Sequence, residues 1–134
     1  MCGPSVALEP HVRSQILQPQ DYAEIFRQIP SPKLGITVDV GHFHTAGVDF
    51  KRLIRTWPDR IHNVHVKDHL AAQSVAIGRG EIDLRGLVVE LHRIGYQGAL
   101  AVEMEVTDPE NLPRYLPQAF NHMQRILNDV CGPS

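Results

Sequence analysis

The sequence of 134 residues has only two cysteines, Cys2 and Cys131, and each lies in a Cys-Gly-Pro-Ser tetrapeptide at one end of the chain. Two such cysteines exclude a disulfide framework and a paired-cysteine zinc site. The repeated ends are typical of a cloning scar or of the seam of a cut or duplicated gene, and a Cys2–Cys131 bond requires that the ends meet. We therefore expect residues 1–5 and 131–134 to be tails that flank one domain, residues 6–130.

Long hydrophobic runs and clusters of one charge are also absent. The chain has 13 Lys plus Arg against 15 Asp plus Glu, and the basic residues are scattered along it. This balance argues against a phosphate-neutralising surface, so we expect no nucleic-acid partner. No apolar run approaches the roughly 18 residues of a membrane span, and the N-terminus lacks the basic and apolar stretches of a signal peptide. These absences predict a soluble, cytoplasmic protein with no membrane partner.

Short β-like runs alternate with amphipathic helical runs along the chain, a pattern typical of βα units and a parallel sheet. Asp83 and Asn111 are the expected N-caps of the last two helices, and Gly95 is the expected stop of the third. Residues 41–47 and 68–82 are expected to be loops. The predicted strands are 6–9, 34–40, 61–67 and 99–106, and the predicted helices are about 20–29, 49–57, 84–94 and 112–130.

Each predicted strand has one apolar face and one small or polar face, because strand side chains alternate between the two faces of a sheet. In the second strand, for example, Thr37 and Asp39 lie opposite Val38. The carboxyl ends of parallel strands meet at one edge of the sheet, where active sites assemble. Each polar face has an ionisable residue near that end, and the four residues are Glu9, Asp39, His65 and Glu103.

Three carboxylates and one imidazole make a coherent ligand set for one divalent cation such as Mn²⁺, Mg²⁺ or Zn²⁺. A cation would also offset the repulsion between converging carboxylates. The alternative is that the four groups are strand ends with independent hydrogen bonds. Five of the eight histidines lie between residues 42 and 69, yet His44, His62 and His69 receive no role from this pattern.

Five motifs occur in one order along the chain, and together they resemble the xylose-isomerase-like TIM-barrel superfamily of sugar-phosphate isomerases and epimerases. The resemblance covers nearly the whole chain between the repeated ends. The motifs are Val-Ala-Leu-Glu-Pro-His (6–11), Val-Asp-Val-Gly-His (38–42), Val-His-Val-Lys-Asp (64–68), Ile-Gly-Arg-Gly-Glu-Ile-Asp (77–83) and Ala-Val-Glu-Met-Glu (101–105).

The resemblance implies that Glu9, Asp39, His65 and Glu103 bind one divalent metal ion. It also implies that one of Glu9 and Glu103 removes a proton alpha to the metal-polarised carbonyl and that the other returns it to the resulting enediolate. The implied function is a metal-dependent isomerase or epimerase of a sugar or polyol. An inosose-type dehydratase, which uses similar ligands but eliminates water, is the alternative enzyme.

Two further residues receive substrate roles. The resemblance implies that His42, three residues after Asp39, hydrogen-bonds a substrate oxygen. Lys67 shares the inward face with His65, so it could hold a substrate oxygen or instead pair with Asp68. Glu105 lies one inward step beyond Glu103 and could exchange roles with it.

The chain has four βα units, whereas the barrel of this superfamily has eight. The matched motifs belong to the second half of such barrels, so the fold implied is a (βα)4 half of a TIM barrel with parallel strands. We expect self-association, as a homodimer or a higher homo-oligomer, to complete the eight-stranded barrel. Paired halves would crowd two ligand sets into one mouth, so a non-catalytic half-barrel that folds and self-associates is a further alternative.

Overall fold

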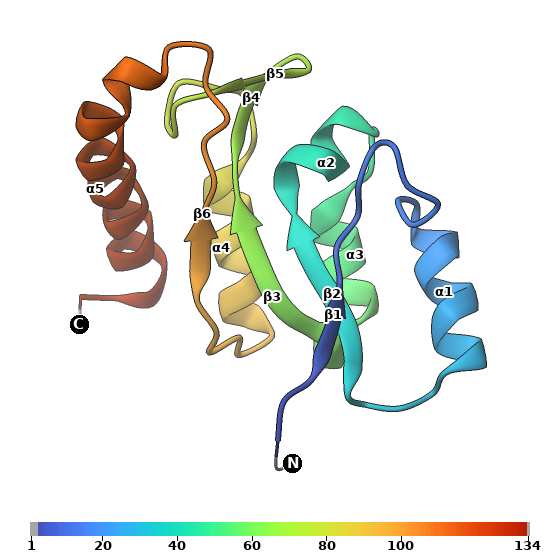
Figure 1. The fold of residues 1–134 in the computed structure, drawn as a ribbon. Helices are drawn as coiled ribbons and strands as arrows, with labels where there is room; N and C mark the ends of the chain where they lie inside the picture. Colours follow the sequence, from blue (N-terminus) through green and yellow to red (C-terminus); the bar gives the residue numbers. More distant parts are fainter. Residues whose placement is uncertain (1–2, 134) are drawn as a thin grey trace.

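Four short parallel strands form the sheet at the centre of the molecule (Figure 1). The computed structural model describes residues 3–133. The strand order is β1-β2-β3-β6, so β1 and β6 are the two edges of the sheet. The four strands are β1 (Val6–Leu8), β2 (Leu34–Asp39), β3 (Ile61–Val66) and β6 (Leu100–Val102).

The helices alternate with these strands, which confirms the predicted α/β fold with a parallel sheet. In Figure 1, α3 and α4 lie behind the sheet, α1 and α5 lie at its two sides, and a small antiparallel hairpin stands near the carboxyl ends of the strands. The helices are α1 (Pro19–Gln28), α2 (Val40–Thr45), α3 (Phe50–Thr56), α4 (Leu84–Arg93) and α5 (Leu112–Cys131), with short 3₁₀ helices at Pro58–Arg60 and Pro109–Asn111, and the hairpin consists of β4 (Asp68–Leu70) and β5 (Gln73–Val75).

The core lies between the helices and one face of the sheet. Alternate residues of β2 and β3 reach this face, and Ile36, Val38 and Val64 are fully buried there. They pack with apolar residues of the covering helices, among them Leu53 and Leu87. The other face has small or polar residues at the intervening positions, so the alternation predicted from the sequence places the polar strand residues away from this core.

Both predicted N-cap positions are confirmed, but only one of the two side chains makes a capping bond. The Asp83 carboxylate accepts the N–H of Gly86 at 2.8 Å and caps α4, as predicted. Asn111 occupies the N-cap position of α5, as predicted, but its side chain makes no capping bond to that helix. The side-chain amide of Asn111 instead donates to Asp108 at 2.8 Å and stabilises the preceding 3₁₀ turn.

Three element boundaries also differ from the prediction. Residues 41–47 were expected to be a loop, but most of them form α2, because the Asp39 carboxylate caps a turn that buries Val40 and Phe43. The expected loop 68–82 contains the β4–β5 hairpin, which turns at Ala71 with a positive φ of 51°. The last strand was expected to reach residue 106, but it ends at Val102, and there the chain leaves the edge of the sheet.

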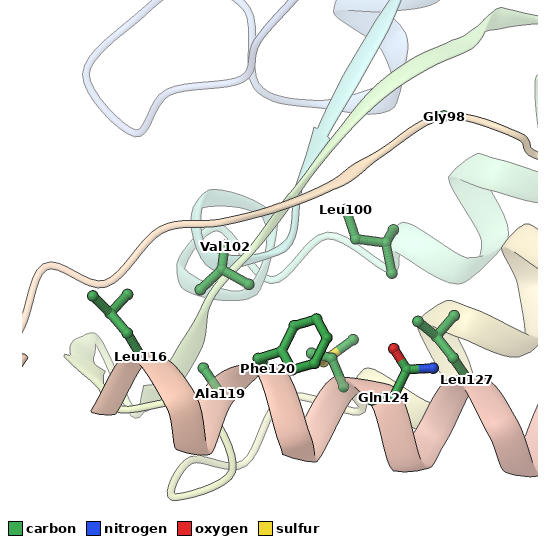
Figure 2. Close-up of a pocket in the computed structure, with 9 residues that line it drawn as sticks. Gly98, Leu100, Val102, Leu116, Ala119, Phe120, Gln124 and Leu127 are labelled. Carbon is green, nitrogen blue, oxygen red and sulfur yellow. The ribbon is translucent and has the colours of Figure 1, made fainter. Parts of the chain in front are cut away.

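An apolar groove of about 490 Å³ lies between β6 and α5 (Figure 2). Figure 2 shows Leu100 and Val102 on one side and Leu116, Phe120 and Leu127 on the other. Phe120 and Leu116 are 65% and 56% exposed. Because β6 has a neighbouring strand on one side only, the groove follows an open edge of the sheet.

Within residues 3–133, no helix combines the length and the apolar character that a membrane crossing requires. Cys131 ends α5 and is exposed. Cys2 and Ser134 lie outside the described residues, so the predicted tails and the Cys2–Cys131 alternative stay predictions.

Candidate metal centre

Four side chains from four strands converge where the strands end. Glu9 follows β1, Asp39 ends β2, His65 lies near the end of β3 and Glu103 follows β6. One ligand atom from each residue lies within 4.8 Å of those of the other three. The sheet register explains the convergence, because Asp39 is paired with His65, and His65 with Ala101, in neighbouring strands. The structure therefore brings together the four residues that the sequence singled out.

The Asp39 side chain is the most enclosed of the four, with 0% exposure. Its Oδ1 accepts the N–H of His42 at 3.0 Å, which caps α2. Its Oδ2 has no hydrogen-bond partner in the described part of the chain and lies 3.5 Å from both His65 Nδ1 and Lys67 Nζ. A buried carboxylate oxygen without a hydrogen bond is costly unless a positive charge faces it.

The His65 ring turns one nitrogen toward the carboxylates and the other toward Asn63. Its Nδ1 lies 2.9 Å from Glu9 Oε1 and 3.3 Å from Glu103 Oε1. Its Nε2 lies 3.2 Å from the side-chain amide of Asn63. A metal-ligating histidine usually donates its remote ring N–H to an acceptor, whereas here the remote nitrogen faces the Asn63 side-chain nitrogen, which is a donor. The Asn63 contact still holds Nδ1 in place among the three carboxylates.

Lys67 extends into the same cluster and is 4% exposed. Its Nζ lies 3.2 Å from Glu103 Oε2 and 3.5 Å from Asp39 Oδ2, and it donates to Glu105 Oε1 at 3.2 Å. Burial alone would lower the pKa of Lys67, but the charge of Asp39 and the hydrogen bonds to Glu105 and Glu103 raise it above its ordinary value. Lys67 is therefore a buried ammonium group surrounded by carboxylates.

Asp68 does not pair with Lys67, so that alternative is wrong. Successive side chains of an extended segment point to opposite sides, and the Asp68 carboxylate turns away from the cluster toward backbone N–H groups. The carboxylate accepts the N–H groups of His69, Gly78, Gly80 and Ile82 at 2.9 to 3.2 Å. These four hydrogen bonds fold the segment after β5 back onto the hairpin.

His42 lies in the first turn of α2, beside Asp39. Its ring stacks on that of His11 at a tilt of 42°, with the ring centroids 4.3 Å apart. Burial has the largest effect on this group and lowers the pKa of His42 below its ordinary value. A neutral imidazole has one donor and one acceptor nitrogen, so His42 is suited to hydrogen-bond a hydroxyl group.

A second polar cluster, which the sequence did not reveal, joins α2 to the β4–β5 hairpin. His44 Nε2 lies 3.1 Å from Glu81 Oε1, and His69 Nδ1 lies 3.3 Å from Thr45 Oγ1. The two rings meet edge to face with centroids 5.9 Å apart. Burial first, then the charges of His44 and Lys67, lower the pKa of His69. These residues stayed unassigned because both elements that unite them were expected to be loops.

A comparison with known protein families identifies the family of this chain. The family described as xylose isomerase-like TIM barrel matches residues 2–126. The chain belongs to this family. The membership confirms the resemblance that the five sequence motifs indicated.

Two curated proteins show how much of a longer protein this xylose isomerase-like chain corresponds to. It is 32% identical over 126 residues to the uncharacterized protein MJ1311 of Methanocaldococcus jannaschii, a match that covers 85% of this chain and 43% of that protein. It is 31% identical over 84 residues to the putative L-ribulose-5-phosphate 3-epimerase SgbU of Escherichia coli, covering 57% of this chain and 29% of that one. The matches thus span less than half of either relative.

Solved structures of xylose isomerase-like proteins have the same fold. A xylose isomerase domain protein from Planctomyces limnophilus matches with a TM-score of 0.81 at 24% identity, over 96% of this chain and 49% of that one. An IolI protein with a binding zinc atom matches with a TM-score of 0.77 at 21% identity, over 94% of this chain and 50% of that one. At these identities the likeness concerns the fold alone.

The donor set of this xylose isomerase-like chain fits a divalent cation. Three carboxylates and one imidazole are ligands that such cations accept, and their atoms already lie close together. A cation among them would also face Asp39 Oδ2, the buried oxygen that lacks a hydrogen bond in the described residues. The cluster is therefore a candidate site for a divalent metal ion.

Proposed function

We propose that this chain supplies the cation site of a divalent-metal-dependent isomerase or epimerase that acts on a sugar or polyol. The observation that carries the proposal is Asp39 Oδ2, which is buried, lacks a hydrogen-bond partner among the described residues, and belongs to a convergent ligand set. Hydrogen bonds within the cluster leave this oxygen unsatisfied, whereas a cation would satisfy it. Family membership and the names of the relatives support the substrate class.

Glu9, Asp39, His65 and Glu103 would hold the cation, and Mn²⁺, Mg²⁺ and Zn²⁺ all suit these donors. When bound, a divalent cation polarises a substrate carbonyl and makes the neighbouring C–H bond more acidic. The Asn63 side-chain nitrogen donates to His65 Nε2, which leaves the proton of a neutral ring on Nδ1. Cation binding through Nδ1 would therefore require the other tautomer, with the Asn63 amide turned so that its oxygen accepts from Nε2.

Glu9 and Glu103 are the proposed base and acid. Their side chains are 42% and 39% exposed, so both can reach a molecule that lies on the polar face of the sheet. They directly follow β1 and β6, which are the opposite edges of the sheet. One glutamate would take a proton from the carbon beside the carbonyl, and the other would return a proton from its own side.

His42 is the proposed partner of a substrate oxygen. Its lowered pKa keeps the ring neutral near pH 7, and its backbone N–H is already committed to Asp39. Lys67 is the second predicted substrate contact, although carboxylates already surround its ammonium group.

We also propose that the chain is a (βα)4 half-barrel that a second copy completes. Three observations support this proposal: the chain covers about half of the matched structures, both edge strands have an open side, and an apolar groove follows the β6 edge. Closure would pair β6 of one copy with β1 of the other and would shield the polar face of both sheets. A closed pair would bring two ligand sets to one mouth, which favours a non-catalytic scaffold as the second candidate function.

Cation binding tests the site directly. We expect the full chain, stripped with EDTA, to bind one Co²⁺ or Mn²⁺ per chain at micromolar or lower concentration in calorimetry. Asp39→Asn should weaken this binding by at least about tenfold. Losing a residue that only hydrogen-bonds a metal ligand already costs about tenfold or more in metal affinity, and losing a ligand should cost no less. Asp49→Asn is the matched control, since Asp49 caps α3 in the same manner through Arg52 N–H at 3.0 Å. Absence of micromolar binding would refute the proposed function.

Proton exchange tests the chemistry. With cation present, ketoses incubated with the protein in D₂O should exchange the proton beside the carbonyl, and Glu103→Gln should abolish the exchange. A conjugated carbonyl product, seen by its absorbance, would instead identify a dehydratase. A protein that binds the cation but exchanges no proton would be the non-catalytic half-barrel.

A further inference from the structure

We propose that Lys67 is the internal counter-ion of the carboxylate cluster, which balances it when no metal is bound and lowers its affinity for a divalent cation. This inference rests on the proposed function for the identity of the cation site. It makes Lys67 a positioning residue rather than a substrate contact.

The contacts of the ammonium group carry the first step. Lys67 Nζ lies within 3.5 Å of three different carboxylates, those of Asp39, Glu103 and Glu105. Among residues 3–133, it is the only lysine or arginine nitrogen within 4.0 Å of any carboxylate of the cluster. The cluster thus has one permanent positive charge against four acidic side chains, if Glu105 is counted with the three predicted ligands.

The side chain is built into its position. Lys67 is 4% exposed, and its methylene groups run beside Gly41 at the start of α2. A Cβ at position 41 would lie 2.7 Å from Lys67 Cδ and 3.1 Å from Lys67 Cβ, so only a residue without a side chain leaves room for the lysine there. Glycine at this position therefore allows the lysine to enter the cluster from beneath α2.

The position of Nζ also orients Glu103. Lys67 contacts Oε2 of Glu103 at 3.2 Å, whereas Oε1 of the same carboxylate faces His65 Nδ1 at 3.3 Å. Asp39 Oδ2 likewise has Lys67 on one side and His65 on the other, each at 3.5 Å. Lys67 therefore stands next to two predicted ligands, where its charge repels an incoming cation while it holds their oxygens in place.

Co²⁺ titrations followed by visible absorption separate this role from a substrate role. We expect Lys67→Met to bind Co²⁺ at least about tenfold more tightly than the wild type, because a neighbouring positive charge is removed. Lys67→Arg keeps the charge and should stay within about threefold of the wild type. Lys51→Met is the matched control, since Lys51 also pairs with a carboxylate, Asp83 at 2.8 Å, away from the cluster. Unchanged or weaker Co²⁺ binding by Lys67→Met would overturn the inference.

Thermal unfolding in EDTA provides the second readout. Without cation, Lys67→Met should unfold at a lower temperature than the wild type, and added Co²⁺ should restore more stability to the variant than to the wild type. If the variant stays unfolded even with saturating Co²⁺, the lysine serves packing alone and the inference fails. A wild type that binds no Co²⁺ would refute the proposed function instead, while the comparison in EDTA would still test the counter-ion.

Discussion

Two buried carboxylates near strand ends, Asp39 and Asp68, have opposite surroundings. Asp39 Oδ2 makes no hydrogen bond to the described residues, whereas Asp68 accepts four backbone N–H groups. Backbone N–H groups occupy the Asp68 oxygens and make this carboxylate an anchor, whereas Asp39 Oδ2 has only the longer ion-pair contacts of 3.5 Å to Lys67 and His65 and stays available as a ligand. At the residue scale, the difference comes from which side of the chain each aspartate occupies.

The anchoring role of Asp68 predicts that the isosteric substitution Asp68→Asn strongly destabilises the fold. In Asp68→Asn, an NH₂ group would face backbone N–H groups, and the charge that strengthens the remaining bonds would be lost. We expect the free energy of unfolding to fall by about 2–4 kcal/mol in urea titrations. Amide exchange at Gly78 and Gly80 should accelerate as well. Asp129→Asn, at an exposed ion pair with Arg85, should cost less than about 0.5 kcal/mol, and equal losses would contradict the anchor.

His69 predicts a pH dependence of stability. The folded protein holds the pKa of His69 below its ordinary value of 6.5, through burial first and then through His44 and Lys67. The unfolded chain therefore binds a proton more readily, so stability is lost as the pH falls through 6.5 toward the folded pKa. The free energy of unfolding should drop between pH 7.5 and 5.5 and drop less in His69→Gln. An NMR titration that gave His69 a pKa above 6.5 would contradict this account.

At the scale of elements, α2 links the cation site to the hairpin. The helix is capped by Asp39, leaves room for Lys67 beside Gly41, and brings Thr45 to His69. The six residues of α2 thus connect one predicted ligand, Asp39, and Lys67 to a second polar cluster. A substitution in the first turn of α2 should therefore alter both the cation site and the polar cluster at the hairpin.

Gly41→Ala tests this link. Its Cβ would lie 2.7 Å from Lys67 Cδ and 2.8 Å from His69 Nε2, so neither side chain could keep its position. We expect a loss of about 1–3 kcal/mol in the free energy of unfolding, together with altered Co²⁺ affinity. Gly86→Ala in α4 is the comparison, because its Cβ would clash with the Asp83 carboxylate that caps α4, so it should also destabilise the fold but leave the Co²⁺ affinity unchanged.

Much of the fold was predictable because its signals are local. Alternation in β2 and β3 reveals which residues face the core, and Asp83 before an amphipathic run marks the start of α4. The missed elements depend on contacts that a single sequence does not state. The Asp68 bonds that fold the segment after the hairpin come from residues up to 14 positions away, and α2 is too short to have a periodic pattern.

The candidate site was also predictable in part: its four proposed ligands were, but the contacts around Lys67 were not. Parity along the strands singled out Glu9, Asp39, His65 and Glu103 before any geometry was known, since equivalent ends of parallel strands must meet. The surroundings of Lys67 were not predictable. Both Glu103 and Glu105 lie beyond the end of β6, so only the course of the chain after Val102 decides that one lysine contacts both.

The proposed assembly makes a prediction for the whole molecule. If a second copy covers the groove, light scattering should give at least twice the 15.0 kDa mass of one chain. Leu116→Glu should lower that mass, because it places a charge in the groove. Leu70→Glu, at a similarly exposed leucine on the hairpin, should not. A wild type that stays monomeric at all concentrations would refute the paired half-barrel.

The two open edges of the sheet also decide how such an assembly can grow. In the proposed pairing, β6 of one copy meets β1 of the next, so each edge contact joins unlike surfaces. Two copies form a closed ring only if each sheet curves through half a turn, because otherwise each added copy leaves a fresh edge for the next. A closed ring has a fixed mass that stops rising with concentration, whereas an open chain of copies lengthens without limit. The curvature of four strands therefore decides between a defined particle and a filament.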